Sequence, residues 1–85
     1  MKLVAEISLY PLNLDYIPPI QAFIDRLNTY PQLEVNTSMT STVVSGDYLP
    51  TMQILAEEMQ RSHQRIGQAI FVCKFLNGDK MSNKS

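Results

Sequence analysis

Apolar residues recur at every second position from Leu3 to Leu9 near the start of the chain. This period of two predicts a half-buried strand over residues 2–10, and Pro11, which has no N–H to give to a ladder, ends it. The side that we expect to face the core carries Leu3, Ala5, Ile7 and Leu9. The opposite side carries Val4, Glu6, Ser8 and Tyr10. An acid, a hydroxyl and a phenol therefore share one side of a strand, which is either wet surface or part of a site.

The segment after this strand has the 3.6-residue period of a helix. Asp15 is the expected N-cap, and Pro18 and Pro19 fit a first turn whose backbone donors are unpaired in any case. The apolar stripe of this helix comprises Ile20, Phe23, Ile24 and Leu27. Pro31 is expected to close the helix.

A second helix is expected to start at Gly46-Asp47, with Asp47 as its cap and Pro50 in its first turn. Its expected apolar stripe comprises Met52, Leu55, Ala56, Met59, His63 and Ile66. Gly67 is expected to end it, because glycine readily adopts the left-handed conformation that terminates helices.

The remaining segments are rich in strand-forming residues. Residues 33–38 and 41–45 predict a hairpin with a tight turn at Met39-Thr40. Residues 69–76 (AIFVCKFL) are apolar on both sides and predict a last strand, followed by the turn Asn77-Gly78.

The order of these elements predicts an α+β, ferredoxin-like βαββαβ fold: a four-stranded antiparallel sheet with two helices on one face. Strands 2–10 and 41–45 are its expected central neighbours. Residues 1–78 form one ligand-binding domain in this interpretation, and the polar residues 79–85 are expected to be a disordered tail. Two helices cover only one face of a sheet, so the other face is left for solvent, a ligand or a partner. A chain this small would gain stability from pairing.

Composition narrows the class of protein. The 85 residues carry a net charge of −1 and no basic cluster, which argues against a nucleic-acid partner. No apolar run approaches the roughly 18 residues that a membrane span needs, and no signal-peptide pattern follows Met1. The single cysteine, Cys73, allows no internal disulfide and fits a reducing cytoplasm. We therefore expect a cytoplasmic protein with no nucleic-acid or membrane partner.

No set of residues predicts catalysis. His63 lies on the expected apolar stripe near the end of a helix, where a structural histidine is more common than a catalytic base. Cys73 lies in an apolar strand without a second thiol, which favours a buried, inert side chain. No residues have the spacing of metal ligands, and the three glycines are scattered singly, so no loop is built to hold phosphate. We expect no enzyme activity, no metal and no cofactor.

Polar residues on the strands are the remaining candidates for a site. They are Glu6, Ser8, Tyr10, Asn36, Ser38, Ser41 and Thr42. Solvated strand surface accounts for such residues, since Ser, Thr and Tyr are common in strands. The competing interpretation is a shallow small-molecule site across the two central strands. There, hydroxyls and free backbone groups would bind a small ring while Tyr10 stacks on it.

Three motifs carry a family resemblance. SLYPL, the DYI that follows it, and STVVSGD at the start of the second helix resemble the YkoF-like family of thiamine- and hydroxymethylpyrimidine-binding proteins. The resemblance spans residues 3–78 in the same element order. It implies binding of thiamine or its pyrimidine portion in transport, salvage or sensing, and no catalysis. It also implies a homodimer or homotetramer whose units pair through their sheets.

The resemblance also implies site residues. Ser8 and Leu9 fall within SLYP, where the Leu9 backbone would meet the pyrimidine, and Thr42 is the expected side-chain contact. One branch of the family has a glutamate before the glycine and a histidine within the second helix. This chain has Ser45 and Met59 there, so contacts specific to that branch are missing. Glu6 is the available carboxylate for a cationic ring, or for a salt bridge across a dimer.

Two other functions stay open at this level. One is a small enzyme of the dimeric α+β barrel type, which uses the same fold. The other is a protein-interaction or regulatory sensing module whose open face binds only protein. Thiamine, its phosphates and a pyrimidine precursor stay open as ligands, as do a dimer and a tetramer as assemblies.

Overall fold

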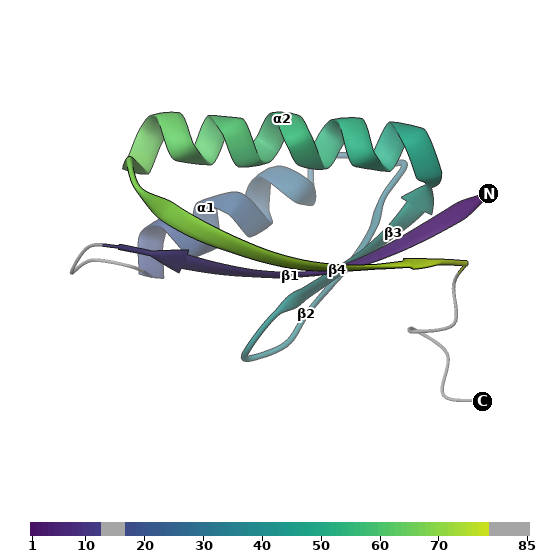
Figure 1. Cartoon of the computed structure of the whole chain (residues 1–85), viewed down its shortest axis with the longest axis horizontal. Helices are drawn as coiled ribbons and strands as arrows, with labels where there is room; N and C mark the ends of the chain where they lie inside the picture. Colours follow the sequence, from purple (N-terminus) through teal and green to yellow (C-terminus); the bar gives the residue numbers. More distant parts are fainter. Residues whose placement is uncertain (13–16, 79–85) are drawn as a thin grey trace.

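The computed structural model describes residues 1–12 and 17–78 (Figure 1). Its elements, in chain order, are β1 (Lys2–Pro11), α1 (Ile17–Leu27), β2 (Glu34–Thr37), β3 (Thr42–Asp47), α2 (Tyr48–Ile66) and β4 (Ala69–Asn77). The strands form one antiparallel sheet in the order β2-β3-β1-β4. The predicted ferredoxin-like α+β fold is therefore confirmed, with β1 and β3 as the central neighbours.

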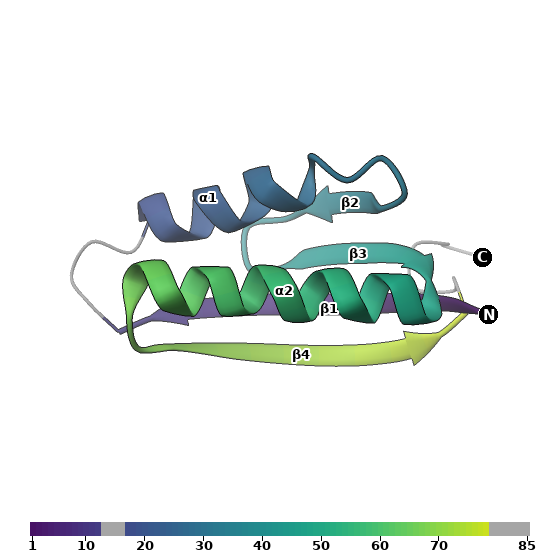
Figure 2. The ribbon, with the colours of Figure 1, turned by 90° about the horizontal axis from the view of Figure 1, so that it is seen from above.

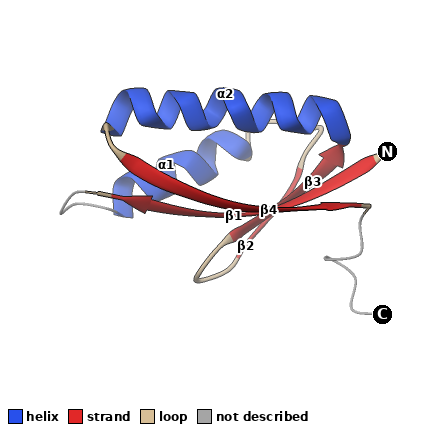
Figure 3. Cartoon of the chain, viewed as in Figure 1, coloured by secondary structure: helices blue, strands red, loops and turns tan. Residues whose placement is uncertain are grey.

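Both helices lie on the same face of this sheet (Figures 2 and 3). The predicted core side of β1 meets them, because Ala5, Ile7 and Leu9 belong to the main hydrophobic cluster. The other buried members of the cluster are Phe23, Leu27, Val44, Ile54 and Leu55. Burial of such side chains is worth about 1.5–3 kcal/mol each, which makes this helix–sheet interface the main source of stability.

Helix α1 ends at Leu27, before the expected stop at Pro31. The reason lies in two polar side chains that bond to the last turn. Asn28 Nδ2 donates to the Ile24 carbonyl at 3.1 Å, and Thr29 Oγ1 donates to the Arg26 carbonyl at 2.6 Å. The N–H and hydroxyl of Thr29 both occupy the Arg26 carbonyl, which the Tyr30 N–H would meet in a continued helix, and the Tyr30 N–H bonds to the Leu27 carbonyl instead. The expected cap at Asp15 and the expected tail at 79–85 lie outside the described residues.

Helix α2 corrects the predicted apolar stripe. Its buried residues are Thr51, Ile54, Leu55 and Glu58. Ala56 and His63, which the prediction placed on the buried stripe, are exposed. The helix is rotated from the expected orientation because a carboxylate, Glu58, is buried through partners on other parts of the chain.

The two ends of α2 differ in how they are capped. Asp47 is the N-cap residue by position, but its side chain makes no capping hydrogen bond and instead lies 3.1 Å from Lys2 Nζ. Gly67 at the C-terminal end has φ +79°, a conformation that only glycine adopts without strain, and its N–H donates to the His63 carbonyl. The predicted end of the helix is confirmed.

Gly46 in β3 allows α2 to approach the sheet closely. A Cβ atom at this position would lie 2.5 Å from Thr51 Oγ1 and 3.2 Å from the Gln32 carbonyl oxygen. The glycine is therefore required by packing, and its φ is not in the left-handed region.

Candidate functional site

A cavity of about 90 Å³ lies between α1 and the ends of β1 and β3. Strand β1 and helix α1 provide its apolar walls. Residues 37–42, which form the end of β2, the hairpin turn and the start of β3, provide most of its polar groups. The lining comprises Ile7, Ser8, Leu9, Ile20, Phe23, Ile24 and residues 37–42. A single water needs about 10–15 Å³, so this space is larger than a packing defect.

The backbone of Leu9 has no partner on β3, on the side where the cavity lies. The Lys2 carbonyl bonds to the Gly78 N–H and the Leu12 N–H to the Gln68 carbonyl, so even-numbered residues of β1 direct their backbone groups toward β4. Because successive residues alternate, Leu9 directs its N–H and C=O toward β3. The pairing of β1 with β3 stops at Ile7–Thr42. One backbone donor and one acceptor are therefore left without a β3 partner at the cavity.

The hydroxyl of Thr42 is the most deeply placed side-chain polar group of the cavity. Thr42 is 5% exposed, and its Oγ1 has one contact, at 3.5 Å, with Thr37 Oγ1. That distance is long for a hydroxyl–hydroxyl hydrogen bond, so the group keeps most of its capacity for a ligand. A buried hydroxyl with a weak partner gains from any polar group that enters the cavity.

The hairpin turn beside the cavity is held by its serines. Ser38 Oγ accepts from the N–H groups of Thr40 and Ser41 and donates to the Ser41 carbonyl. Ser8 Oγ donates to the Thr40 carbonyl at 3.2 Å, which ties β1 to the turn. The backbone of the turn is therefore fixed at the rim of the cavity.

The structure divides the eight candidate site residues into two groups. Ser8, Leu9, Ser38, Ser41 and Thr42 line the cavity. Glu6, Tyr10 and Asn36 lie on the open face of the sheet instead, which follows from their cross-strand partners Lys74, Ile70 and Val43. The site was expected on the open face of the sheet. Thr42 does not lie there, because it pairs with Ile7 and so faces the helices. The aromatic ring in the cavity wall is Phe23, not Tyr10.

Glu6 nevertheless remains connected to the cavity. Its Oε2 accepts a hydrogen bond from Ser41 Oγ at 3.3 Å, and its Oε1 lies 3.8 Å from Lys74 Nζ. Since Ser41 lines the cavity, the carboxylate lies one hydrogen bond away from it. The lining residues themselves, as far as the structure describes them, include no ionisable side chain.

The open face carries an apolar strip formed by Tyr10, Ile70 and Val72. They are 54%, 49% and 48% exposed, respectively. Tyr10 lies directly opposite Ile70 in the β1–β4 ladder, so the three side chains form one surface. Exposed apolar residues that adjoin in this way are typical of contact surfaces.

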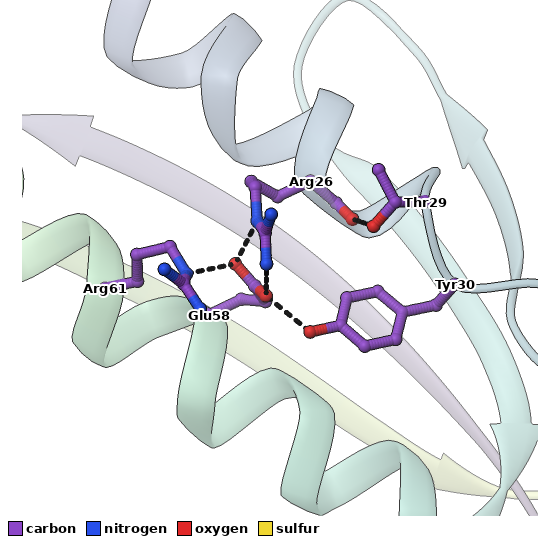
Figure 4. Close-up of polar contacts among 5 residues, drawn as sticks. All are labelled: Arg26, Thr29, Tyr30, Glu58 and Arg61. Carbon is purple, nitrogen blue, oxygen red and sulfur yellow. Dashed lines mark hydrogen bonds and ion pairs between the residues drawn. The ribbon is translucent and has the colours of Figure 1, made fainter.

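A buried carboxylate fixes α1 over the cavity (Figure 4). Glu58, whose side chain is 1% exposed, accepts hydrogen bonds from Arg26 Nε and Nη2 at 3.1 and 3.0 Å. Tyr30 Oη donates to the same carboxylate, and Arg61 Nε lies 3.3 Å from it. These four residues, here called the Glu58 clamp, join α2 to the C-terminal end of α1 and to the turn after it. Because α1 carries Phe23, the clamp also holds one wall of the cavity.

The clamp shifts the proton affinities of its members. The hydrogen bonds from Arg26 lower the pKa of Glu58, and those from Tyr30 act in the same direction against the effect of burial. The hydrogen bond to Glu58 raises the pKa of Tyr30, because the phenol donates to a carboxylate. The clamp is therefore ionised at the carboxylate and neutral at the phenol near pH 7. The sequence offered no local signal for it, since Tyr30 and Arg26 lie 28 and 32 positions from Glu58.

Two residues with reactive side chains lie away from the cavity. His63 makes no hydrogen bond to a residue of the cavity. Its Nε2 lies 3.1 Å from the Ala69 carbonyl oxygen, and its ring meets the ring of Phe71 edge-on. Burial raises the pKa of the Cys73 thiol, which keeps it protonated and poorly nucleophilic. Within residues 1–12 and 17–78, no His, Cys, Asp and Glu residues cluster as metal ligands, and no helix could cross a bilayer.

The geometry defines a small ferredoxin-like α+β domain with a cavity of about 90 Å³, and the comparisons with known proteins agree on the fold. No family model matches the chain, and no curated protein matches it. Among solved structures, a Streptococcus pneumoniae protein superimposes with a TM-score of 0.86 at 24% identity, covering 98% of this chain and 93% of that one.

Two further structures share the fold. A Thermotoga maritima protein, a candidate for thiamine biosynthesis or salvage, has a TM-score of 0.83 at 15% identity, covering 92% of this chain and 85% of its own. A hypothetical protein of Methanocaldococcus jannascii has a TM-score of 0.77 at 22% identity, covering 93% and 82%. At such identities the comparisons show a common fold and leave the function to the site.

Proposed function

We propose that this chain is a non-catalytic binding protein for thiamine or a related aminopyrimidine such as hydroxymethylpyrimidine. The observation that carries the proposal is the convergence, in one cavity, of the Leu9 backbone groups, the Thr42 hydroxyl and the Phe23 ring. An aminopyrimidine has ring nitrogens that accept hydrogen bonds and an amino group that donates them. A small apolar cavity with a few polar groups is how such rings are bound.

The size of the cavity indicates how the ligand would be oriented. The cavity of about 90 Å³ is smaller than an engineered cavity of about 150 Å³ that holds one benzene molecule. No more than one ring of thiamine would therefore enter it, with the ring's substituents toward the open mouth. The pyrimidine would therefore enter, and the thiazolium would stay at the mouth. Glu6, linked to the cavity through Ser41, would favour that positive charge.

The absence of catalysis is part of the proposal. It is supported by the lining of the cavity, whose described residues offer hydroxyls and backbone groups but no side chain that titrates near neutral pH. General acid–base chemistry depends on such a side chain within hydrogen-bonding reach of the substrate.

Calorimetric titration with thiamine and with hydroxymethylpyrimidine tests the proposed function. Thr42→Val should weaken binding by about 1–3 kcal/mol, or roughly 5- to 150-fold in Kd, because a polar ligand atom loses its partner. Thr51→Val is the matched control, since Thr51 is equally buried but its hydroxyl has no partner among the described residues and lies outside the cavity. No heat at millimolar concentrations of either ligand, with the protein folded, would refute the function. Equal affinities of wild type and Thr42→Val would remove Thr42 from the site.

We also propose that two copies pair through their open sheet faces. The apolar strip of Tyr10, Ile70 and Val72 supports this, as does the small size of the domain. Val72→Lys should shift the molecular mass in sedimentation experiments toward the monomer, whereas Leu49→Lys, at an exposed apolar residue elsewhere, should not. A wild-type protein that stays monomeric at high micromolar concentration would contradict the pairing.

A further inference from the structure

Met39 has two properties that rarely occur together in a folded protein. It is one of the residues that line the cavity, yet it is fully exposed, more so than any other exposed large hydrophobic residue of the described chain. An apolar side chain in full contact with water gains free energy when a nearby apolar surface becomes available. At the rim of this cavity, a bound ring would provide that surface.

The backbone of the turn is held in place, so only the side chain of Met39 can move to bury its apolar surface. Ser38 bonds to both residues that follow Met39, and Ser8 holds the Thr40 carbonyl. The turn is therefore fixed at the rim, while Met39 has three rotatable side-chain bonds and no contact that restrains them. Rotation of the side chain alone would suffice to bring its sulfur toward the cavity.

The opposite wall supplies the geometric complement. Phe23 and Ile20 come from α1, and the Glu58 clamp fixes this helix in place. A ring seated against this wall would expose its other face toward the turn. Sulfur–aromatic contacts are favourable at about 5 Å, and methionine is the residue that adapts most readily to a ring of uncertain orientation.

We propose that Met39 is a side-chain cover that closes over the ring in the cavity and contributes to ligand selection. This inference rests on the proposed function and adds to it a residue on the opposite side of the ring from Phe23. Met39 would favour flat, apolar-faced ligands over polar ligands of the same size.

Oxidation of methionine by dilute hydrogen peroxide tests the cover directly. The probe is hydroxymethylpyrimidine, which contains no sulfur to consume the oxidant, at ten times the Kd measured by calorimetry. Sulfoxide formation at Met39 should slow about tenfold, in proportion to the fraction of protein left unbound. Met1, which is 83% exposed and lies outside the cavity, is the internal reference and should be oxidised at an unchanged rate.

Substitutions give a second, independent readout. Met39→Gln keeps the length of the side chain and removes its apolar character, so Kd should rise by about 2- to 12-fold. Met39→Leu should bind within about twofold of wild type, because it preserves the apolar volume. Both variants should melt at the wild-type temperature without ligand, since the side chain has no contacts to lose.

The outcomes separate the two proposals. Calorimetric binding with no protection of Met39 and no change in Met39→Gln would overturn the cover and leave the proposed function intact. No calorimetric binding at all would overturn both. Protection of Met39 and Met1 to the same extent would show that the ligand scavenges oxidant, and with an unchanged Kd in Met39→Gln it would also overturn the cover.

Discussion

Glu58→Gln is the substitution for which the structure gives the clearest magnitude. The carboxylate is buried and accepts three hydrogen bonds, two from Arg26 and one from Tyr30, and it forms an ion pair with Arg61 (Figure 4). Glutamine has nearly the same shape but one carbonyl oxygen, so its amide nitrogen must face two of these donors. Two of these four interactions with the charged acceptor are lost in either orientation.

Each such bond contributes about 1.5–3 kcal/mol. Arg26 and Arg61 are 41% and 51% exposed, so water can replace part of what they lose, and the lower end of the range applies. We therefore expect Glu58→Gln to lower the free energy of unfolding by about 3 kcal/mol. For a domain of this size, that corresponds to a fall in Tm of about 12–24 °C.

Urea denaturation followed by circular dichroism measures this change. The midpoint should fall while the m-value stays constant, which would show that the folded state lost stability without a change in the unfolded chain. Glu57→Gln is the matched control: the neighbouring residue is exposed and accepts a hydrogen bond from Gln53, so its loss should stay within about 0.5 kcal/mol. If Glu58→Gln is as stable as Glu57→Gln, the carboxylate is not the structural link that the geometry indicates.

Two other outcomes follow from the same structure. The pKa of Glu58 is lowered on folding, so its contribution to stability is complete above the unfolded pKa of about 4.5 and is lost as pH falls through the folded pKa. In urea titrations, the difference in stability between wild type and Glu58→Gln should therefore shrink toward pH 3. A difference that stays constant with pH would argue against ionisation as its cause. Gly46→Ala should cost about 1–3 kcal/mol, because the new Cβ would lie 2.5 Å from Thr51 Oγ1, and Thr51→Ala in the same chain should restore part of it; strictly additive effects of the two substitutions would contradict the clash.

Local patterns predicted the elements because each depends on its own residues. Alternation over residues 2–10 predicted β1 and its core side, and the 3.6-residue period predicted α1 and α2. The same patterns could not decide which face of the sheet a residue occupies when the adjacent residue is equally suitable for that face. Ser41 and Thr42 are both small and polar, and only the pairing of Thr42 with Ile7 decides that Thr42 faces the helices.

Burial of a charged residue is the other case in which the sequence was insufficient. Hydrophobicity placed α2 with Met52 and Ala56 inward, whereas the structure buries Glu58. A carboxylate is buried only when donors surround it, and these come from Arg26 and Tyr30 at 32 and 28 positions away. Likewise, the cavity forms where three segments meet, so the resemblance to SLYP and the Ser-Thr segment suggested its residues but not which face of the sheet it occupies.

The two ends of the described chain meet at one end of β1. The Lys2 carbonyl accepts from the Gly78 N–H at 2.8 Å, while Leu9 lies seven residues further along the strand, roughly 23 Å away at about 3.3 Å per residue. A reporter domain or a second copy of the unit could therefore be fused at either end without approaching the cavity. The fold thus permits joining two units head to tail while the cavity of each unit stays accessible.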